Sequence, residues 1–210
     1  MMERDDKRKM SESGVSRRDF LRGGAAGAVA TGIMPAALRG QNASGDAASG
    51  TEVVGPGKVP ITLDVNGRKL ELELEPRVTL LDALRNHLSI TGAKKVCDRA
   101  TCGACTVIVD DKPVYACSML AIEAQGASIA TIEGLGTPEQ MHPIQAAFVD
   151  NDGQQCGYCT PGFVMACKAF LDANPTPSKL EIERGLGGNL CRCGTYNGIK
   201  QLLLEGKGVA

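Results

Sequence analysis

The sequence is poor in aromatic residues and carries almost no net charge. It contains no Trp, and aromatic residues make up only 3% of the 210 residues. The formal net charge is −1, from 23 basic and 24 acidic side chains. Binding to nucleic acid depends on a dense basic surface, and this composition gives no sign of one.

Long apolar runs and histidine clusters are also missing. The part of the chain after residue 50 has no apolar run of the length that a membrane helix needs, so no stable membrane span is expected there. The two histidines, His87 and His142, lack metal-site spacing, and a structural role is expected for both. Hydrophobic residues nevertheless make up 43% of the chain, which is enough for compact cores, and the length of 210 residues has room for one large or two small domains.

Cysteine and glycine, by contrast, are abundant, with nine and 26 residues. Cys97, Cys102 and Cys105 follow the pattern C-x4-C-x2-C, and Cys117 comes after eleven further residues. This is the plant-type spacing for the ligands of a [2Fe–2S] cluster. The short loop around Gly103 lets backbone N–H groups approach the cluster sulfurs and disperse their charge. These four thiols are therefore predicted to form a first metal site.

A second group of four cysteines lies further along the chain. Cys156 and Cys159 form a C-x2-C pair, and Cys191 and Cys193 form a C-x-C pair after thirty-one residues. Thr160-Pro161-Gly162 predicts a helix that begins directly after the first pair, with Thr as its cap and Pro at the first helical position. The positive end of that helix would face an anionic iron–sulfur core. The spacing leaves open which thiolates share an iron.

Disulfides and zinc are the alternatives for these eight cysteines. An exported protein can form disulfides, and zinc can be held by four thiolates. Zinc ribbons usually pair two C-x2-C motifs, however, and the spacings here match cluster ligation twice. The ninth cysteine, Cys167, lies on an apolar stripe with Phe163 and Phe170 and is expected to be a buried core thiol.

Residues 1–50 differ in character from the rest. Ser16-Arg17-Arg18-Asp19-Phe20-Leu21-Arg22 precedes a mildly apolar, Ala- and Gly-rich segment, and together they resemble a twin-arginine export signal. A flexible linker follows, rich in Gly, Ala and Ser. The alternative is a disordered basic tail beside a short helix. Export by this route carries a folded domain with its cluster already inserted, so we expect a periplasmic protein.

Residues 51–133 predict a small mixed sheet over one helix. Alternating apolar residues at 59–65 and 70–74, joined by Asn66-Gly67, are typical of a β-hairpin. Thr79 is the expected cap of a helix that runs to residue 86. The alternating patterns that follow predict strands at 106–109, 114–116 and 127–132, with a turn at 110–113. The second hairpin would bring Cys117 back towards the cysteine loop.

Residues 134–210 predict only helices. Apolar stripes occur in four stretches, with Ser178 as the expected cap of the third helix and Gly206 at the end of the fourth. Four short helices imply a small bundle with metal ligands at helix ends.

The two cysteine sets, with Gln155-Cys156-Gly157-Tyr158-Cys159-Thr160-Pro161-Gly162 and Gly188-Asn189-Leu190-Cys191-Arg192-Cys193, resemble the small two-cluster subunit of the molybdenum hydroxylases. This family includes xanthine dehydrogenases, aldehyde oxidoreductases and carbon monoxide dehydrogenases. The likeness covers about residues 59–205. It implies an α+β fold: an N-terminal β-grasp [2Fe–2S] ferredoxin domain, followed by a four-helix-bundle [2Fe–2S]-binding domain.

The resemblance also implies cofactors, partners and site residues. Each cysteine set would hold one [2Fe–2S] cluster, with Cys97, Cys102, Cys105 and Cys117 as ligands of the first and Cys156, Cys159, Cys191 and Cys193 as ligands of the second. A separate large subunit would carry the molybdopterin cofactor, with Gln155 and Cys193 approaching the pterin. A FAD-binding subunit or an external acceptor would take the electrons. The family often has Gly where this chain has Ala100, so Ala would be strained there if the position needs positive φ.

These observations predict an electron-transfer subunit of an exported molybdenum hydroxylase that acts on an aldehyde or an N-heterocycle. Electrons would pass from the second cluster to the first and then outward. No residue of this chain is predicted to act on the substrate, so its part in the oxidoreductase is redox only. The alternative is a binding protein: a stand-alone ferredoxin-like carrier, which needs only one exposed cluster, or a cluster-dependent structural module without enzyme partners.

Overall fold

The computed structural model describes residues 54–205. The expected export signal and most of the linker lie outside this range, and so does Gly206. None of the helices in the described range is long and apolar enough to span a membrane.

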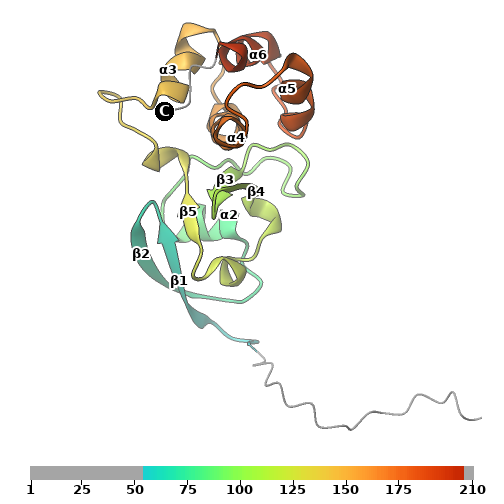
Figure 1. Cartoon of the computed structure of the whole chain (residues 1–210). Helices are drawn as coiled ribbons and strands as arrows, with labels where there is room; N and C mark the ends of the chain where they lie inside the picture. The colour runs from blue at the N-terminus through green and yellow to red at the C-terminus, as the bar shows by residue number, and fades with distance from the viewer. Residues whose placement is uncertain (1–53, 206–210) are drawn as a thin grey trace, which may run out of the picture. The chain divides into compact units, whose positions relative to one another are not determined.

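Five strands form a mixed sheet in the order β2-β1-β5-β3-β4 (Figure 1). The strands are β1 (Val59–Val65), β2 (Arg68–Leu74), β3 (Thr106–Val109), β4 (Lys112–Tyr115) and β5 (Ser128–Ala130). Two antiparallel hairpins, β1–β2 and β3–β4, flank β5, which runs parallel to β1 and antiparallel to β3. The prediction of a mixed sheet in this part of the chain is confirmed.

Both predicted hairpins are present, but the second has a shorter turn than expected. Asn66 and Gly67 have φ of 53° and 73°, as a two-residue type I′ turn requires. Asp110 and Asp111 also have positive φ, 46° and 63°, and make the second turn alone. The expected turn over 110–113 is therefore wrong by two residues, because Lys112 already pairs with β3. The expected strands at 114–116 and 127–132 are likewise shifted or shortened.

The helix over the sheet is short and changes its winding. α2 (Leu80–Asp82) begins at Thr79, whose hydroxyl accepts a hydrogen bond from the Asp82 N–H at 3.1 Å, as predicted for the cap. A π-helical turn follows at Ala83–His87, where the Leu88 N–H donates to the Ala83 carbonyl five residues earlier. Leu80, Leu81 and Leu84 are buried in the core against the sheet.

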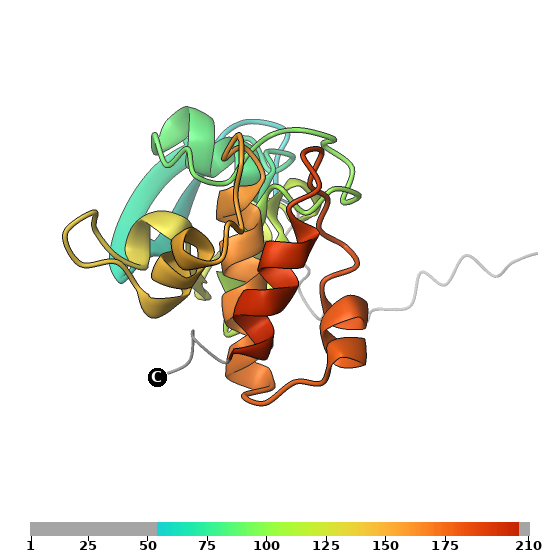
Figure 2. The ribbon, with the colours of Figure 1, turned by 90° about the horizontal axis from the view of Figure 1, so that it is seen from above.

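Residues after 140 form four helices (Figure 2). They are α3 (Pro143–Asp150), α4 (Thr160–Ala173), α5 (Lys179–Gly185) and α6 (Tyr196–Leu204). α3 contacts both α4 and α6, and α5 contacts α6. Ser178 caps α5 through a reciprocal pair of hydrogen bonds with Glu181, which confirms the predicted cap.

Two apolar cores hold these elements. One lies between the sheet and α2, and the other lies among α3–α6 and contains Phe148, Phe163 and Cys167. Ile108 of β3 packs with Met165 and Ala169 of α4, so the sheet and the helices also share an apolar contact. Cys167 is fully buried, as expected for a core thiol.

Candidate iron–sulfur centres

The first three cysteines lie on a loop that runs from residue 96 to the start of β3. Positive φ at Asp98, Ala100 and Gly103 (54°, 52° and 69°) curls this loop so that its N–H groups point inward. The Ala100 N–H donates to the Cys117 Sγ at 3.3 Å, and the Thr101 N–H donates to the Cys97 Sγ at 3.4 Å. Cys117 therefore does return to the loop, as the predicted second hairpin requires.

Two thiols of this first set, Cys97 and Cys105, differ in acidity. Hydrogen bonds from the backbone of Thr101 and then Arg99, with a smaller effect of the neighbouring Cys102 thiol, lower the pKa of Cys97 to about 7. Burial raises the pKa of Cys105, which lies beside Cys117, to about 12. A bound metal must displace the proton of such a buried thiol, because only thiolates are metal ligands.

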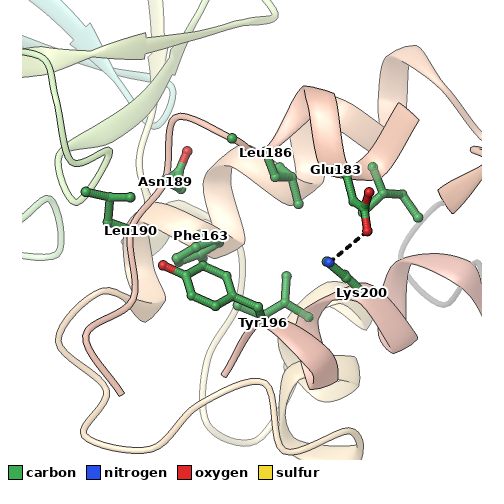
Figure 3. A pocket seen from close by; sticks show the side chains of 10 residues that line it. Phe163, Glu183, Leu186, Asn189, Leu190, Tyr196 and Lys200 are labelled. Atoms are coloured by element: carbon green, nitrogen blue, oxygen red, sulfur yellow. Dashed lines mark hydrogen bonds and ion pairs between the residues drawn. The ribbon is translucent and has the colours of Figure 1, made fainter. Parts of the chain in front are cut away.

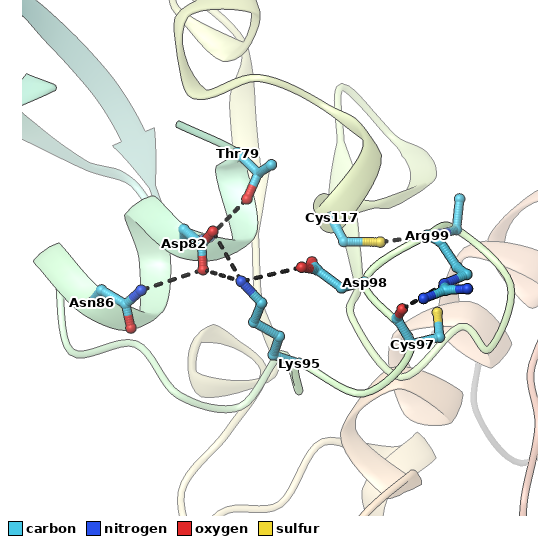
Figure 4. A network of polar contacts seen from close by, with 9 residues as sticks. Thr79, Asp82, Asn86, Lys95, Cys97, Asp98, Arg99 and Cys117 are labelled. Carbon is cyan, nitrogen blue, oxygen red and sulfur yellow. Dashed lines mark hydrogen bonds and ion pairs between the residues drawn. The ribbon is translucent and has the colours of Figure 1, made fainter. Parts of the chain in front are cut away.

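Lys95 ties the cysteine loop to α2 (Figure 4). Its ammonium lies 2.9 Å from the Asp82 carboxylate and 3.2 Å from that of Asp98. The hydrogen bonds to Asp82 and then Asp98 raise the pKa of Lys95. The Asp82 N–H in turn binds the cap hydroxyl of Thr79. This lysine anchors the loop at its start, a contact that the charge pattern alone did not indicate.

The second set combines two exposed and two more buried thiols. Cys156 and Cys193 are exposed and neighbour each other, while Cys159 is half-buried beside the buried Cys191. Burial, followed by the Cys191 thiol, raises the pKa of Cys159 to about 12. Burial also acts to raise the pKa of Cys191, but hydrogen bonds led by the Thr195 side chain bring it down to about 7. The Cys191 thiol lies 3.2 Å from the Thr195 hydroxyl.

The N-terminus of α4 follows Cys159 directly, as predicted, but Thr160 is not its cap. The cap residue is Cys159, and the helix begins at Thr160 with Pro161 in its first turn. The Thr160 hydroxyl oxygen is buried and has no hydrogen-bond partner. The backbone N–H of Thr160 donates to the Gly157 carbonyl at 3.3 Å, and the helix begins one residue earlier than its composition suggests.

A buried asparagine lies between the two thiol sets. Asn189 is 6% exposed, and its amide donates to the carbonyls of Gly103 at 3.0 Å and Gly162 at 3.3 Å. The next residue, Leu190, donates its N–H to the Cys102 carbonyl at 3.0 Å. The sequence shows Asn189 only as one letter of a motif, and no local pattern marks it as a buried donor.

The surface beside the second set is hollow and apolar. A cavity of about 410 Å³ is lined by thiols of both sets, by the exposed Tyr158 and Leu190, and by Arg192. Gln155 is also exposed, directly before Cys156. A separate cavity of about 560 Å³ lies between α5 and α6, with the Glu183–Lys200 ion pair of 2.9 Å on its wall and no thiol in its lining (Figure 3).

These donor sets fit a [2Fe–2S] cluster. All nine cysteines are free thiols, and eight of them form the four neighbouring pairs 97/102, 105/117, 156/193 and 159/191. Two irons held by four thiolates need two thiolates each. Within residues 54–205, no group of three or more His, Cys, Asp or Glu side chains is arranged around a single metal position.

Comparison with known families matches three stretches of the chain. Residues 63–128 match the 2Fe-2S iron-sulfur cluster binding domain, and residues 131–202 match a second family, the [2Fe-2S] binding domain. Residues 14–34 match the signal sequence of the twin-arginine translocation pathway.

Known proteins resemble the chain along most of its length. It is 41% identical over 209 residues to the aldehyde oxidoreductase iron-sulfur-binding subunit PaoA of Escherichia coli O157:H7, covering 92% of this chain and 89% of that protein. The chain belongs to the iron–sulfur subunits of the molybdenum hydroxylase family. It is also 42% identical over 151 residues to the nicotine 6-hydroxylase small subunit of Paenarthrobacter nicotinovorans, covering 72% of this chain and 91% of that protein.

A solved structure agrees with this assignment. The crystal structure of quinoline 2-oxidoreductase from Pseudomonas putida 86 superimposes with a TM-score of 0.68 at 37% identity, covering 70% of this chain and 91% of that chain. The protein therefore has an α+β fold with two [2Fe–2S]-binding domains, is a component of an oxidoreductase, and carries a twin-arginine export signal.

Proposed function

We propose that this protein relays electrons through two [2Fe–2S] clusters, from the molybdopterin site of a large subunit to a flavin subunit or an external acceptor. The ligands would be Cys97, Cys102, Cys105 and Cys117 for the first cluster and Cys156, Cys159, Cys191 and Cys193 for the second. When bound, such a cluster takes up and releases one electron at a time. The observation that carries the proposal is the pairing of eight free thiols, with N–H donors on two of their sulfurs.

The protein's own groups would hold and tune the clusters. The N–H groups of Ala100 and Thr101 donate to ligand sulfurs and so disperse negative charge on the first cluster. Burial of Cys105 and Cys159 excludes water on one side of each site and disfavours charge unless a metal compensates it.

The second thiol set would face the large subunit. Gln155, Cys156 and Cys193 are all exposed, and the apolar cavity with Tyr158 and Leu190 opens beside them. We place Gln155 and Cys193 next to the pterin of the partner, while the first set would serve the outward acceptor. The enzyme would then hydroxylate an aldehyde or an N-heterocycle on its large subunit.

The division of the chain follows from the same proposal. Residues 1–50 would be the signal and linker, 51–133 the ferredoxin-like β-grasp domain and 134–210 the helical domain. α3–α6 would correspond to a four-helix bundle. Twin-arginine export would place the assembled enzyme in the periplasm.

Low-temperature EPR with iron counting tests the cluster assignment. The chain is purified anaerobically and reduced with dithionite. We expect two distinct S = 1/2 signals and about four irons per chain. A single signal would remove one of the two sites from the proposal, and a chain without iron would overturn the relay altogether.

Co-purification of a molybdenum-containing large chain is expected, whereas an iron-loaded monomer that reduces acceptors alone would indicate a carrier.

Gln155 can be tested against its exposed neighbour. In the isolated complex, Gln155→Ala is expected to slow reduction of the clusters after substrate is added, because a contact with the pterin is lost. The matched control is Gln154→Ala, which changes the same side chain one residue away and should leave that rate unchanged. Equal rates for the two variants would contradict the placement of Gln155.

A further inference from the structure

Asn189 joins three segments that carry or adjoin cluster ligands. Its side-chain nitrogen donates to the carbonyl of Gly103, which follows Cys102, and to the carbonyl of Gly162 in the first turn of α4. It also lies 3.4 Å from the hydroxyl of Thr106, which itself donates to the Gly103 carbonyl at 2.6 Å. An asparagine amide has two N–H donors, so both are used inside the protein.

The backbones meet at this point without room for side chains. A Cβ on Gly103 would lie 2.5 Å from the Cγ of Asn189, and a Cβ on Gly162 would lie 2.4 Å from the Gly103 carbonyl oxygen. Because no side chain separates them, the loop of the first thiol set rests directly on the start of α4. The Leu190 N–H adds a hydrogen bond to the Cys102 carbonyl, next to Cys191.

Asn189 is buried but lines one of the cavities of the protein. Figure 3 shows it beside the cavity lined by Leu190, Phe163 and Tyr196, on the segment that leads to Cys191. The Tyr196 hydroxyl accepts a hydrogen bond from the Cys191 N–H at 2.8 Å, so this segment is held from its other end as well. Removing the Asn189 amide would leave the segment held to the loop by the Leu190–Cys102 hydrogen bond, so its position relative to the loop would be less tightly fixed.

We propose that Asn189 is a positioning residue that fixes the loop of Cys102 against the segment of Cys191 and so sets the separation of the two clusters. This rests on the proposed function, in which both thiol sets hold clusters. Residues that contact the ligand-bearing segments fix the position and orientation of the ligands. Loss of even one such contact lets the ligands move. Asn189 acts on both thiol sets at once. Its amide binds the carbonyl of Gly103, the residue after Cys102, and Asn189 itself lies two residues before Cys191.

Pulsed EPR on the reduced full-length chain, purified with its natural complex, measures the spin–spin interaction between the two clusters. We expect Asn189→Ala to keep its iron but to broaden the distribution of that interaction relative to the unchanged protein. The matched control is Asn197→Ala, an exposed asparagine on α6, which should retain the narrow distribution. An Asn189→Ala chain with full iron and an unchanged distribution would overturn the inference.

A milder variant covers the case in which Asn189→Ala does not fold. Thr106→Val keeps a strand-forming residue in β3 but removes the hydroxyl that contacts both Asn189 and Gly103. A smaller broadening of the same kind is expected, and an unchanged distribution in this folded variant would contradict the role of the contact.

Failure of the proposed function gives a separate result. If the unchanged chain holds no iron, the relay is wrong, and the positioning role is then measured by hydrogen exchange in the metal-free chain. The Leu190 amide is expected to exchange faster in Asn189→Ala than in the unchanged chain, while amides of the β1–β2 hairpin keep their rates. Equal exchange at Leu190 would overturn the inference independently of the clusters.

Discussion

Ala100 occupies a backbone conformation that suits glycine. Its φ is 52°, and its N–H donates to the Cys117 sulfur at 3.3 Å. The methyl group costs free energy in this left-handed region, because Cβ approaches the following carbonyl oxygen. In this conformation the N–H points at the Cys117 sulfur, and that hydrogen bond offsets part of the cost.

Ala100→Gly is therefore expected to stabilise the iron-loaded chain by about 1 kcal/mol, as strain at positive φ is relieved. Denaturant unfolding monitored through the cluster absorbance measures this gain. Ala127→Gly serves as the control, because Ala127 has no positive φ and packs against the first core. That change should lower stability, and a loss in both variants would contradict strain at Ala100.

His142 caps α3 only in its neutral form. Its Nδ1 accepts a hydrogen bond from the Ile144 N–H at 3.2 Å, which a protonated ring cannot do. Burial and then the nearby Lys168 lower the pKa of His142, while Asp172 acts in the opposite direction. Since the unfolded chain binds this proton more readily, stability is full above the ordinary histidine pKa of about 6.5 and is lost as pH falls below it.

We expect the thermal unfolding midpoint to decrease as the pH is lowered from 8 to 5. The His142→Asn variant should show a smaller decrease, because Asn keeps a capping oxygen but does not titrate. Thermal unfolding monitored by circular dichroism across this pH range makes the measurement. His87→Asn, at an exposed position, is the control and should keep the original pH dependence. An equal slope for the unchanged protein and His142→Asn would exclude the cap as its source.

At the scale of elements, the contact between α4 and the first cysteine loop depends on Gly162. Glycine inside a helix usually costs about 1 kcal/mol relative to alanine. Here an added Cβ would lie 2.4 Å from the Gly103 carbonyl oxygen and 2.9 Å from the Ala104 Cα. Close backbone approach thus outweighs helix propensity at this position.

Gly162→Ala is expected to destabilise the chain by about 1–3 kcal/mol, the usual cost of overpacking, although alanine favours the helix. Equilibrium unfolding in urea would show the loss. The control is Gly187→Ala, where a Cβ would meet nothing closer than 3.5 Å and φ is not positive. A Gly162→Ala chain as stable as Gly187→Ala would mean that the loop and α4 can separate freely.

At the scale of the whole molecule, the proposed function implies that both thiol sets are loaded with clusters before the chain leaves the cytoplasm. A twin-arginine signal at residues 14–34 suits this order, because that route carries folded proteins. Replacing both Arg17 and Arg18 by Lys is expected to retain the iron-loaded chain in the cytoplasm. Cell fractionation with iron analysis of each fraction checks this, and a single Arg22→Lys change is the matched control. Unchanged periplasmic yield in the double variant would count against this route.

Local sequence patterns determined the turns, the helix caps and the candidate metal ligands of this protein. The Asn66-Gly67 turn, the caps Thr79 and Ser178 and the spacing of the cysteines act over a few residues, so the sequence alone predicts them. The α+β class and the two-cluster family were implied by the resemblance that the two cysteine motifs carry.

Contacts between distant segments were decided only by the tertiary structure. Asn189 reaches Gly103 across 86 residues, because α4 packs against β3 and brings the sheet and the helices together. Within the helical part of the chain, thiols 159 and 191 become neighbours although thirty-one residues separate them. The spacing of cysteines along the sequence restricts which residues can bind a metal. The hydrogen-bond partners of a buried amide such as Asn189 depend instead on which distant segments of the backbone pack together.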